Sequence, residues 1–118
     1  MNTNHDDTGV LTWQEFEKVE MCVGTIISVT DFEKARNPSY KLTIDFGHKG
    51  IKKSSAQITG LYTKEALIGK QIVAVLNFPP KQIADFMSEC LLLGAVGDTG
   101  DVTILTVEQP VKNGTSIA

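Results

Sequence analysis

The chain has 118 residues, of which 42% are hydrophobic, and a formal net charge of −3. This length suits one domain with a core of its own, and no apolar stretch approaches the roughly 18 residues of a membrane-spanning helix. The N-terminus lacks the basic start and the apolar centre of a secretory signal, so we expect a cytoplasmic protein without membrane insertion.

The first ten residues are polar and predict a flexible tail, which leaves one folded domain over residues 11–118. A short helix is expected next, because Thr12 and Glu15 form a T-x-x-E capping box. Trp13 and Phe16 share one face of this helix.

The first three strands are expected within residues 22–59. The β-branched run from Cys22 to Thr30 predicts the first, in which Gly24 marks a bulge or a close approach. Residues 40–46, YKLTIDF, alternate apolar and polar side chains and predict the second. A turn at 47–50 leads to the third strand, IKKSSAQIT, at 51–59.

A short helix is expected at 63–69, and two further strands at 70–78 and 88–96. A Gly/Asp turn at 97–101 precedes a last strand at 102–107. Five strands with a helix after the third are typical of the OB-fold, so we predict an all-β fold with short helices, a five-stranded Greek-key barrel with an N-terminal helix. Other small barrels share this order of elements.

Two of these strands raise the question of assembly. QIVAVL at 71–76 and CLLLGAV at 90–96 are apolar on both alternating faces, whereas a barrel strand normally has one face in water. The N-terminal helix or a second subunit would have to cover the other face. We therefore expect a homodimer.

The charge is unevenly distributed along the chain. Residues 1–40 carry seven acids and three bases, and residues 82–118 carry five acids and one base. Residues 41–81 carry two acids and seven lysines. The middle third predicts a cationic surface if the fold gathers these lysines on one face, and scattered solubilising lysines are the alternative.

Catalytic and metal-binding motifs are absent from the sequence. Cys22 and Cys90 have no CxxC spacing and are expected to be reduced, buried thiols. His5 and His48 fall in the tail and in a turn, where neither is well placed as a general base. The chain is therefore interpreted as a binding module, not an enzyme, without cofactor or metal.

Polar side chains in the third strand allow two interpretations. Ser55, Gln57 and Thr59 could pair across the outer face of the sheet, which is the favoured interpretation, or they could line a polar groove.

Four stretches together resemble the CsaA family, small OB-fold proteins described as tRNA-binding proteins and as secretion-linked chaperones. The wider relatives are the tRNA-binding domains appended to some methionyl- and phenylalanyl-tRNA synthetases. The match runs from about Phe16 to Ile117. The stretches are VGTIISVTDFEKARNPSYKLTIDFG (23–47), GIKKSSAQIT (50–59), NFPPKQI (77–83) and SECLLLG (88–94).

The resemblance implies tRNA binding by a homodimer. Asn77 and Lys81 match an N-x-x-P-[RK] segment that borders the RNA site in these relatives, and Ser88 and Glu89 match the S-E segment that follows it. Lys41, expected on the outward side of the second strand, and Lys53, expected near the turn that begins the third, would add phosphate contacts.

The chaperone description implies a second kind of partner, unfolded or exported polypeptide. Phe78, Phe86 and Met87 are the candidates for an apolar peptide-binding surface, although each also suits core or interface packing. Gln82 and Asp85 stand where more basic relatives carry other residues. Since each lost cation removes a potential phosphate contact, the resemblance implies weak RNA binding.

Overall fold

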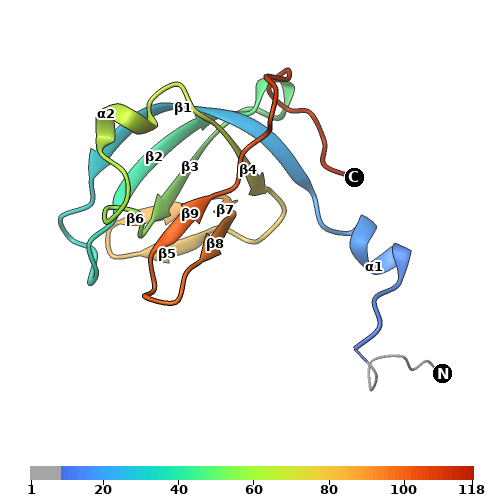
Figure 1. Cartoon of the computed structure of the whole chain (residues 1–118), viewed down its shortest axis with the longest axis horizontal. Coiled ribbons are helices and arrows are strands. Elements are labelled where there is room, and N and C mark those ends of the chain that lie inside the picture. The colour runs from blue at the N-terminus through green and yellow to red at the C-terminus, as the bar shows by residue number, and fades with distance from the viewer. Residues whose placement is uncertain (1–8) are drawn as a thin grey trace.

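Five strands form the main sheet, which curls into a nearly closed antiparallel barrel (Figure 1). The computed structural model describes residues 9–118, so most of the predicted tail lies outside the described residues. The strands follow the order β3-β2-β1-β4-β7, which confirms the predicted all-β barrel of the OB type. Their bounds are β1 Met21–Asp31, β2 Tyr40–Asp45, β3 Ile51–Ala56, β4 Gln71–Val75 and β7 Leu91–Leu92.

Two hairpins and three short helices complete the described part of the chain. Each hairpin is a separate two-stranded sheet, β5 with β6 and β8 with β9. The bounds are β5 Lys81–Ile83, β6 Phe86–Ser88, β8 Gly94–Val96, β9 Val102–Ile104, α1 Trp13–Glu17, the 3₁₀ turn η2 Gly47–Lys49 and α2 Lys64–Leu67.

β1 is the central strand, because it pairs with different neighbours along its length. Its residues 25–31 pair with β2, and residues 21–25 pair with β4. A bulge between Ile26 and Ser28 bends the strand. The bulge is thus not at Gly24, where the predicted close approach is confirmed: a Cβ there would lie 2.6 Å from the Phe46 ring.

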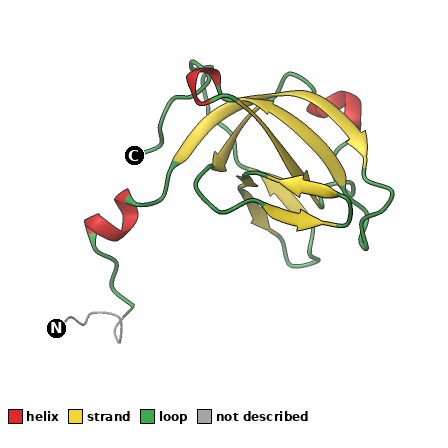
Figure 2. Ribbon diagram, turned by 180° about the vertical axis from the view of Figure 1, so that it is seen from behind, coloured by secondary structure: helices red, strands yellow, loops and turns green. Residues whose placement is uncertain are grey.

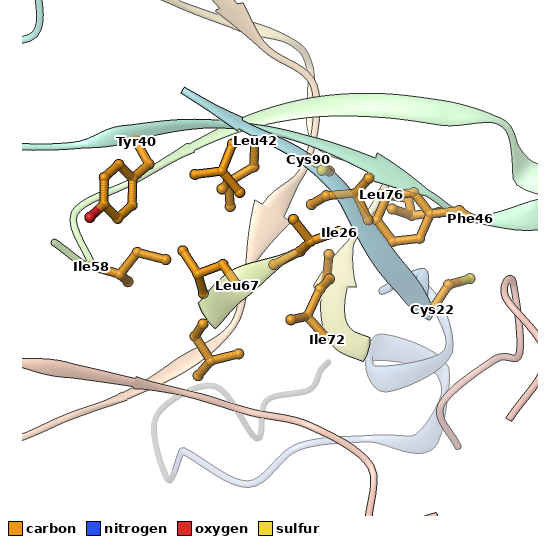
Figure 3. Packing of buried hydrophobic residues seen from close by; sticks show 14 residues of the cluster. Cys22, Ile26, Tyr40, Leu42, Phe46, Ile58, Leu67, Ile72, Leu76 and Cys90 are labelled. Carbon is orange, nitrogen blue, oxygen red and sulfur yellow. The ribbon is translucent and has the colours of Figure 1, made fainter. Parts of the chain in front are cut away.

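The core fills the inside of the barrel (Figure 3). β2 alternates buried and half-buried residues along its whole length, as its sequence predicts. Leu42 and Ile26 are fully buried, and Leu67 of α2 reaches the same cluster at 0% exposure. Leu67 and Ile72 are both among the core side chains shown in Figure 3. The short helix after the third strand therefore contributes a core side chain to the barrel.

Both thiols are free and buried, as predicted. Cys22 and Cys90 belong to the core cluster. Burial raises the pKa of the Cys90 thiol to about 11, so this thiol stays protonated at neutral pH.

The prediction of a single strand at 88–96 was wrong, because different parts of this segment pair with different strands. Ser88 ends β6, which pairs with β5; residues 91–92 pair with β4; and residues 94–96 pair with β9. The last change occurs at Gly94, where a Cβ would lie 2.4 Å from Val102 Cγ1. Apolar periodicity cannot show such changes of partner. The predicted third strand also ends early, at Ala56.

The N-terminal helix α1 stands away from the barrel (Figure 1, Figure 2). The predicted capping box is present: the Thr12 N–H donates to Glu15 Oε1 (2.9 Å), and the Glu15 N–H donates to Thr12 Oγ1 (3.1 Å). No residue of α1 is buried, and Trp13 is 81% exposed. The expectation that this helix covers an apolar strand was wrong, because α1 lies apart from β4, whose residues 72–75 are buried by the rest of the chain.

The C-terminal segment runs beside the first residues of β1. The Val23 N–H donates to the Thr115 carbonyl (2.9 Å), and the Ile117 N–H donates to the Met21 carbonyl (2.9 Å). Gly114 makes this arrangement possible, since its φ is +91° and a Cβ would lie 2.6 Å from the Phe46 carbonyl oxygen. The end of the described chain therefore lies next to the exit of α1.

Candidate functional site

The β5–β6 hairpin carries the strongest candidate site. β4 ends at Val75, and Pro79 and Pro80 lead the chain to β5, where Lys81 lies directly opposite Ser88 of β6. The prolines have fixed φ angles and no N–H to donate, which suits the end of a barrel strand.

A hollow of about 310 Å³ opens beside this hairpin, and we call it the hairpin hollow. Four of the predicted site residues line this hollow, although up to eleven positions separate them in the sequence. The lining residues are Phe78, Pro79, Lys81, Ser88, Glu89, Cys90 and Leu91. The structure thus brings together candidates for RNA binding and one candidate for peptide binding.

Ser88 and Glu89 join the hairpin hollow to β3. The Glu89 N–H donates to the Lys53 carbonyl (2.7 Å), and the Lys53 N–H donates to Glu89 Oε1 (2.9 Å). The Ser55 N–H donates a long bond to Ser88 Oγ (3.4 Å). These bonds help to close the barrel. They also bring the exposed Lys53 next to the hollow; it lies within β3, near the turn that begins this strand, as expected.

Aromatic and ionic contacts fasten the hairpin to the loop at 32–39. The Phe32 and Phe86 rings pack edge to face, with centroids 5.3 Å apart. Lys41 Nζ lies over both rings, 5.0 Å from the Phe32 centroid and 5.5 Å from the Phe86 centroid. Lys41 is half-buried in this contact, so its first role is to hold the hairpin in place.

An acidic residue at the tip of the hairpin neutralises one of the nearby cations. Lys34 Nζ lies 3.2 Å from Asp85 Oδ2. The hydrogen bond from Lys34 lowers the pKa of the Asp85 carboxyl below its ordinary value. Asp85 therefore reduces the positive charge around the hairpin. This agrees with the sequence, in which Asp85 stands where more basic relatives carry another residue.

Asn77 lies outside the hairpin hollow and has two partners already. Its Nδ2 donates to the Lys18 carbonyl (2.6 Å), and its Oδ1 accepts from the Glu20 N–H (2.9 Å). Asn77 thus fixes the exit of α1 to the end of β4. Its role in RNA binding stays a prediction.

A second depression, of about 480 Å³, lies on the other side of Leu91, and we call it the seam groove. Ser55 and Gln57 line it, whereas Thr59 lines a shallower depression of the loop at 32–39. Ser55 and Gln57 thus line a groove, but most of its lining residues are aliphatic, so it is not the polar groove of the sequence hypothesis. Sequence analysis missed Arg36, which also lines the groove; it is the chain's single arginine, which could have drawn attention to it.

Residues 9–118 contain neither a candidate metal site nor a candidate membrane-spanning helix. No group of three or more His, Cys, Asp or Glu side chains in this part of the chain could hold a metal ion. Within the same residues, no helix is long and apolar enough to cross a membrane.

The chain forms a nearly closed five-stranded barrel, and exposed lysines lie beside the hairpin hollow. These features define the class of protein as a small OB-type binding domain. The family model described as "Putative tRNA binding domain" matches residues 21–116. The chain therefore belongs to the tRNA-binding domain family.

Solved structures place the chain near one branch of this family. It is similar to the chaperone CsaA of Bacillus anthracis str. Ames, with 47% identity, a TM-score of 0.88, and coverage of 92% of this chain and 99% of that one. It is also similar to the CsaA chaperone protein of Picrophilus torridus, with 50% identity, a TM-score of 0.86, and coverage of 92% and 100%. The predicted resemblance to CsaA proteins is confirmed.

Curated relatives include much longer proteins. A methionine–tRNA ligase of Methanocaldococcus jannaschii is 32% identical over 86% of this chain, which corresponds to 15% of the ligase. The chain thus spans about a seventh of the length of that relative. The similarity concerns the tRNA-binding domain and not the catalytic part of a ligase.

Proposed function

We propose that this chain is a non-catalytic tRNA-binding protein that acts as a homodimer in the cytoplasm. One observation carries the RNA-binding proposal: Lys53 and Lys81 are both exposed beside the hairpin hollow, and neither has an ion pair within residues 9–118. Lys34, Lys49 and Lys64, by contrast, each pair with a carboxylate. Unpaired cations are those that can release counterions when they contact phosphates.

The hollow offers further groups that suit RNA. Phe78 is 56% exposed there, and an exposed ring can stack on an unpaired base. The hydroxyl of Ser88 would lie near a ribose or a base edge. Glu89 would act by holding Lys53 in place, through the two hydrogen bonds that it makes with the Lys53 backbone. Lys41, above the two rings, would reach a phosphate at the edge of the hairpin.

Substitution of Lys81 by Ala tests this proposal. We expect weaker tRNA binding and a slope of log affinity against log salt that is shallower by about 0.7–0.9, because one phosphate contact is lost. The measurement is a tRNA titration at two or more salt concentrations.

The control is Lys112→Ala, which removes another exposed lysine, in the C-terminal turn and outside the hollow. This variant should keep the slope of the unaltered protein. Absence of tRNA binding at low salt, or an affinity that does not depend on salt, would contradict the RNA-binding proposal.

Polypeptide binding is the second candidate function, and exposed apolar side chains near the hairpin favour it. Phe78 is 56% exposed and Met87 46% exposed. Large side chains exposed in this way can hold apolar segments of a client protein. Phe86 is buried against Phe32 and packs as part of the fold, so we leave it out of this surface. The solved relatives described as chaperones agree with this candidate.

Phe78→Asp separates the two candidates when it is compared with Lys81→Ala. If the protein holds unfolded clients, Phe78→Asp should reduce its suppression of client aggregation, and Lys81→Ala should leave that suppression unchanged. Light scattering by an aggregating client measures this. Equal aggregation with and without the unaltered protein would eliminate the second candidate.

The homodimer is proposed from the surface around α1. Leu11 is 63% exposed, Trp13 81% and Val19 41%, and a groove of about 580 Å³ lies between α1 and the C-terminal residues 116–118. In a twofold dimer, each copy could place its apolar helix face against the groove of the other. The support for the dimer thus comes from α1, and not from β4, which is already buried within one chain.

A further inference from the structure

The seam groove differs in chemistry from the hairpin hollow. Ten of its sixteen lining residues are aliphatic, including Ile83, Leu92 and Val96. None of the sixteen is aromatic, and Arg36 is the one with a charged side chain. Its volume of about 480 Å³ lies in the range of ordinary ligand sites.

This lining is poorly suited to an RNA base. Proteins that bind unpaired bases stack them on aromatic rings or on arginine planes. The seam groove has no ring, and its single arginine lies in the loop at 32–39 at its rim. Aliphatic walls instead match the aliphatic side chains of a polypeptide, since burial of apolar surface is favourable without further contacts.

The edge of β3 supplies a backbone partner in the same groove. Lys53 and Ser55 use this edge to bind Glu89 and Ser88. Gln57, the next residue on that edge, is exposed, and its backbone N–H has no hydrogen-bond partner within residues 9–118. An extended peptide can bind such an edge by adding a strand to it.

We propose that the seam groove binds an extended polypeptide segment with aliphatic side chains and a carboxylate close to Arg36. The carboxylate belongs to an acidic residue or to a chain end. Arg36 is exposed and has no ion pair in the described part of the chain, and an arginine fork binds a carboxylate through two hydrogen bonds. This inference rests on the second candidate function and assigns it a surface other than that of Phe78.

The experiment uses two synthetic peptides in which Leu and Ser alternate, one with a terminal Asp and the other with a terminal Lys. We expect Val96→Asp to weaken binding of the first peptide by about tenfold or more, because it places an unpaired charge against an apolar ligand. Val96 is 74% exposed, so this change should leave the fold intact, which circular dichroism checks. Val111→Asp, the same substitution at a valine that is 38% exposed and lies outside the groove, should leave affinity unchanged.

Arg36 gives an independent readout, the preference between the two peptides. Arg36→Ala should abolish the preference for the Asp peptide, and Arg36→Lys should retain part of it. Binding is measured by fluorescence anisotropy of the labelled peptides, with labelled oligouridylate as the RNA probe.

The outcomes separate the inference from the function on which it rests. Absence of binding of both peptides and of unfolded clients by the unaltered protein would overturn the second candidate function. Peptide binding that is lost in Phe78→Asp but kept in Val96→Asp would overturn the seam-groove assignment alone. Loss of oligouridylate binding in Val96→Asp, with peptide binding unchanged, would show that RNA occupies the groove and would also overturn the assignment.

Discussion

Leu67→Ala is expected to lower the free energy of unfolding by about 2–5 kcal/mol, the usual range for removing a buried leucine side chain. Leu67 is 0% exposed and is the one residue of α2 that is buried. Because it packs into the same cluster as Ile26, Leu42 and Ile72, the change would leave a cavity inside the barrel. Urea denaturation followed by circular dichroism measures the loss.

Ile68→Ala is the matched control for this prediction. Ile68 is the next residue in the chain, it is 54% exposed, and its truncation also removes a branched aliphatic side chain. We expect a change within about 0.5 kcal/mol, as for most surface substitutions. Similar losses for the two variants would mean that α2 does not anchor the core through Leu67.

Trp13→Ala is expected to weaken the association of two copies into a dimer. If two copies associate through α1 and the C-terminal groove, this substitution should raise the dimer dissociation constant by about thirtyfold or more, since a tryptophan at the centre of an interface commonly contributes at least 2 kcal/mol. The side chain is 81% exposed in the single chain, so its removal should not unfold the barrel. Sedimentation equilibrium at several protein concentrations gives the constant.

Phe78→Ala serves as the control, because it removes another exposed aromatic ring that lies in the hairpin hollow and not at α1. This variant should dimerise like the unaltered protein. A monomeric mass for the unaltered protein at micromolar concentration would contradict the homodimer itself. An unchanged dissociation constant in Trp13→Ala would instead place the interface on another surface.

Local features of the fold could be predicted from the sequence because they depend on neighbours in the chain. The capping box needs only Thr12 and Glu15, and both of its hydrogen bonds are present. The alternation in residues 40–46 reflects the strand period of two, and the burial of β2 follows it. The sequence also indicated a bulge or a close approach at Gly24, although the Phe46 ring that it meets lies 22 positions away in the chain.

The candidate site could be predicted only in part. The resemblance directed attention to residues 77–89, and the structure places Lys81, Ser88 and Glu89 in one hollow. The resemblance could not show that Asn77 already binds the exit of α1. Its partners there, Glu20 and Lys18, lie 57 and 59 positions earlier in the chain. Nor could it show the seam groove, whose walls come from segments between residues 35 and 104.

The sequence by itself determined the class of fold, the places of the main strands and the family, since these follow from local periodicity and from short motifs. The tertiary structure alone decided how residues 81–104 divide among five short strands, and that α1 stands away from the barrel. It also decided which cations remain unpaired, because Lys34 meets Asp85 across 51 positions, while the ammonium groups of Lys53 and Lys81 have no ion pair in residues 9–118. The physical reason is common to these features: each depends on long-range contacts, which are set by how the barrel closes and not by the order of neighbouring residues.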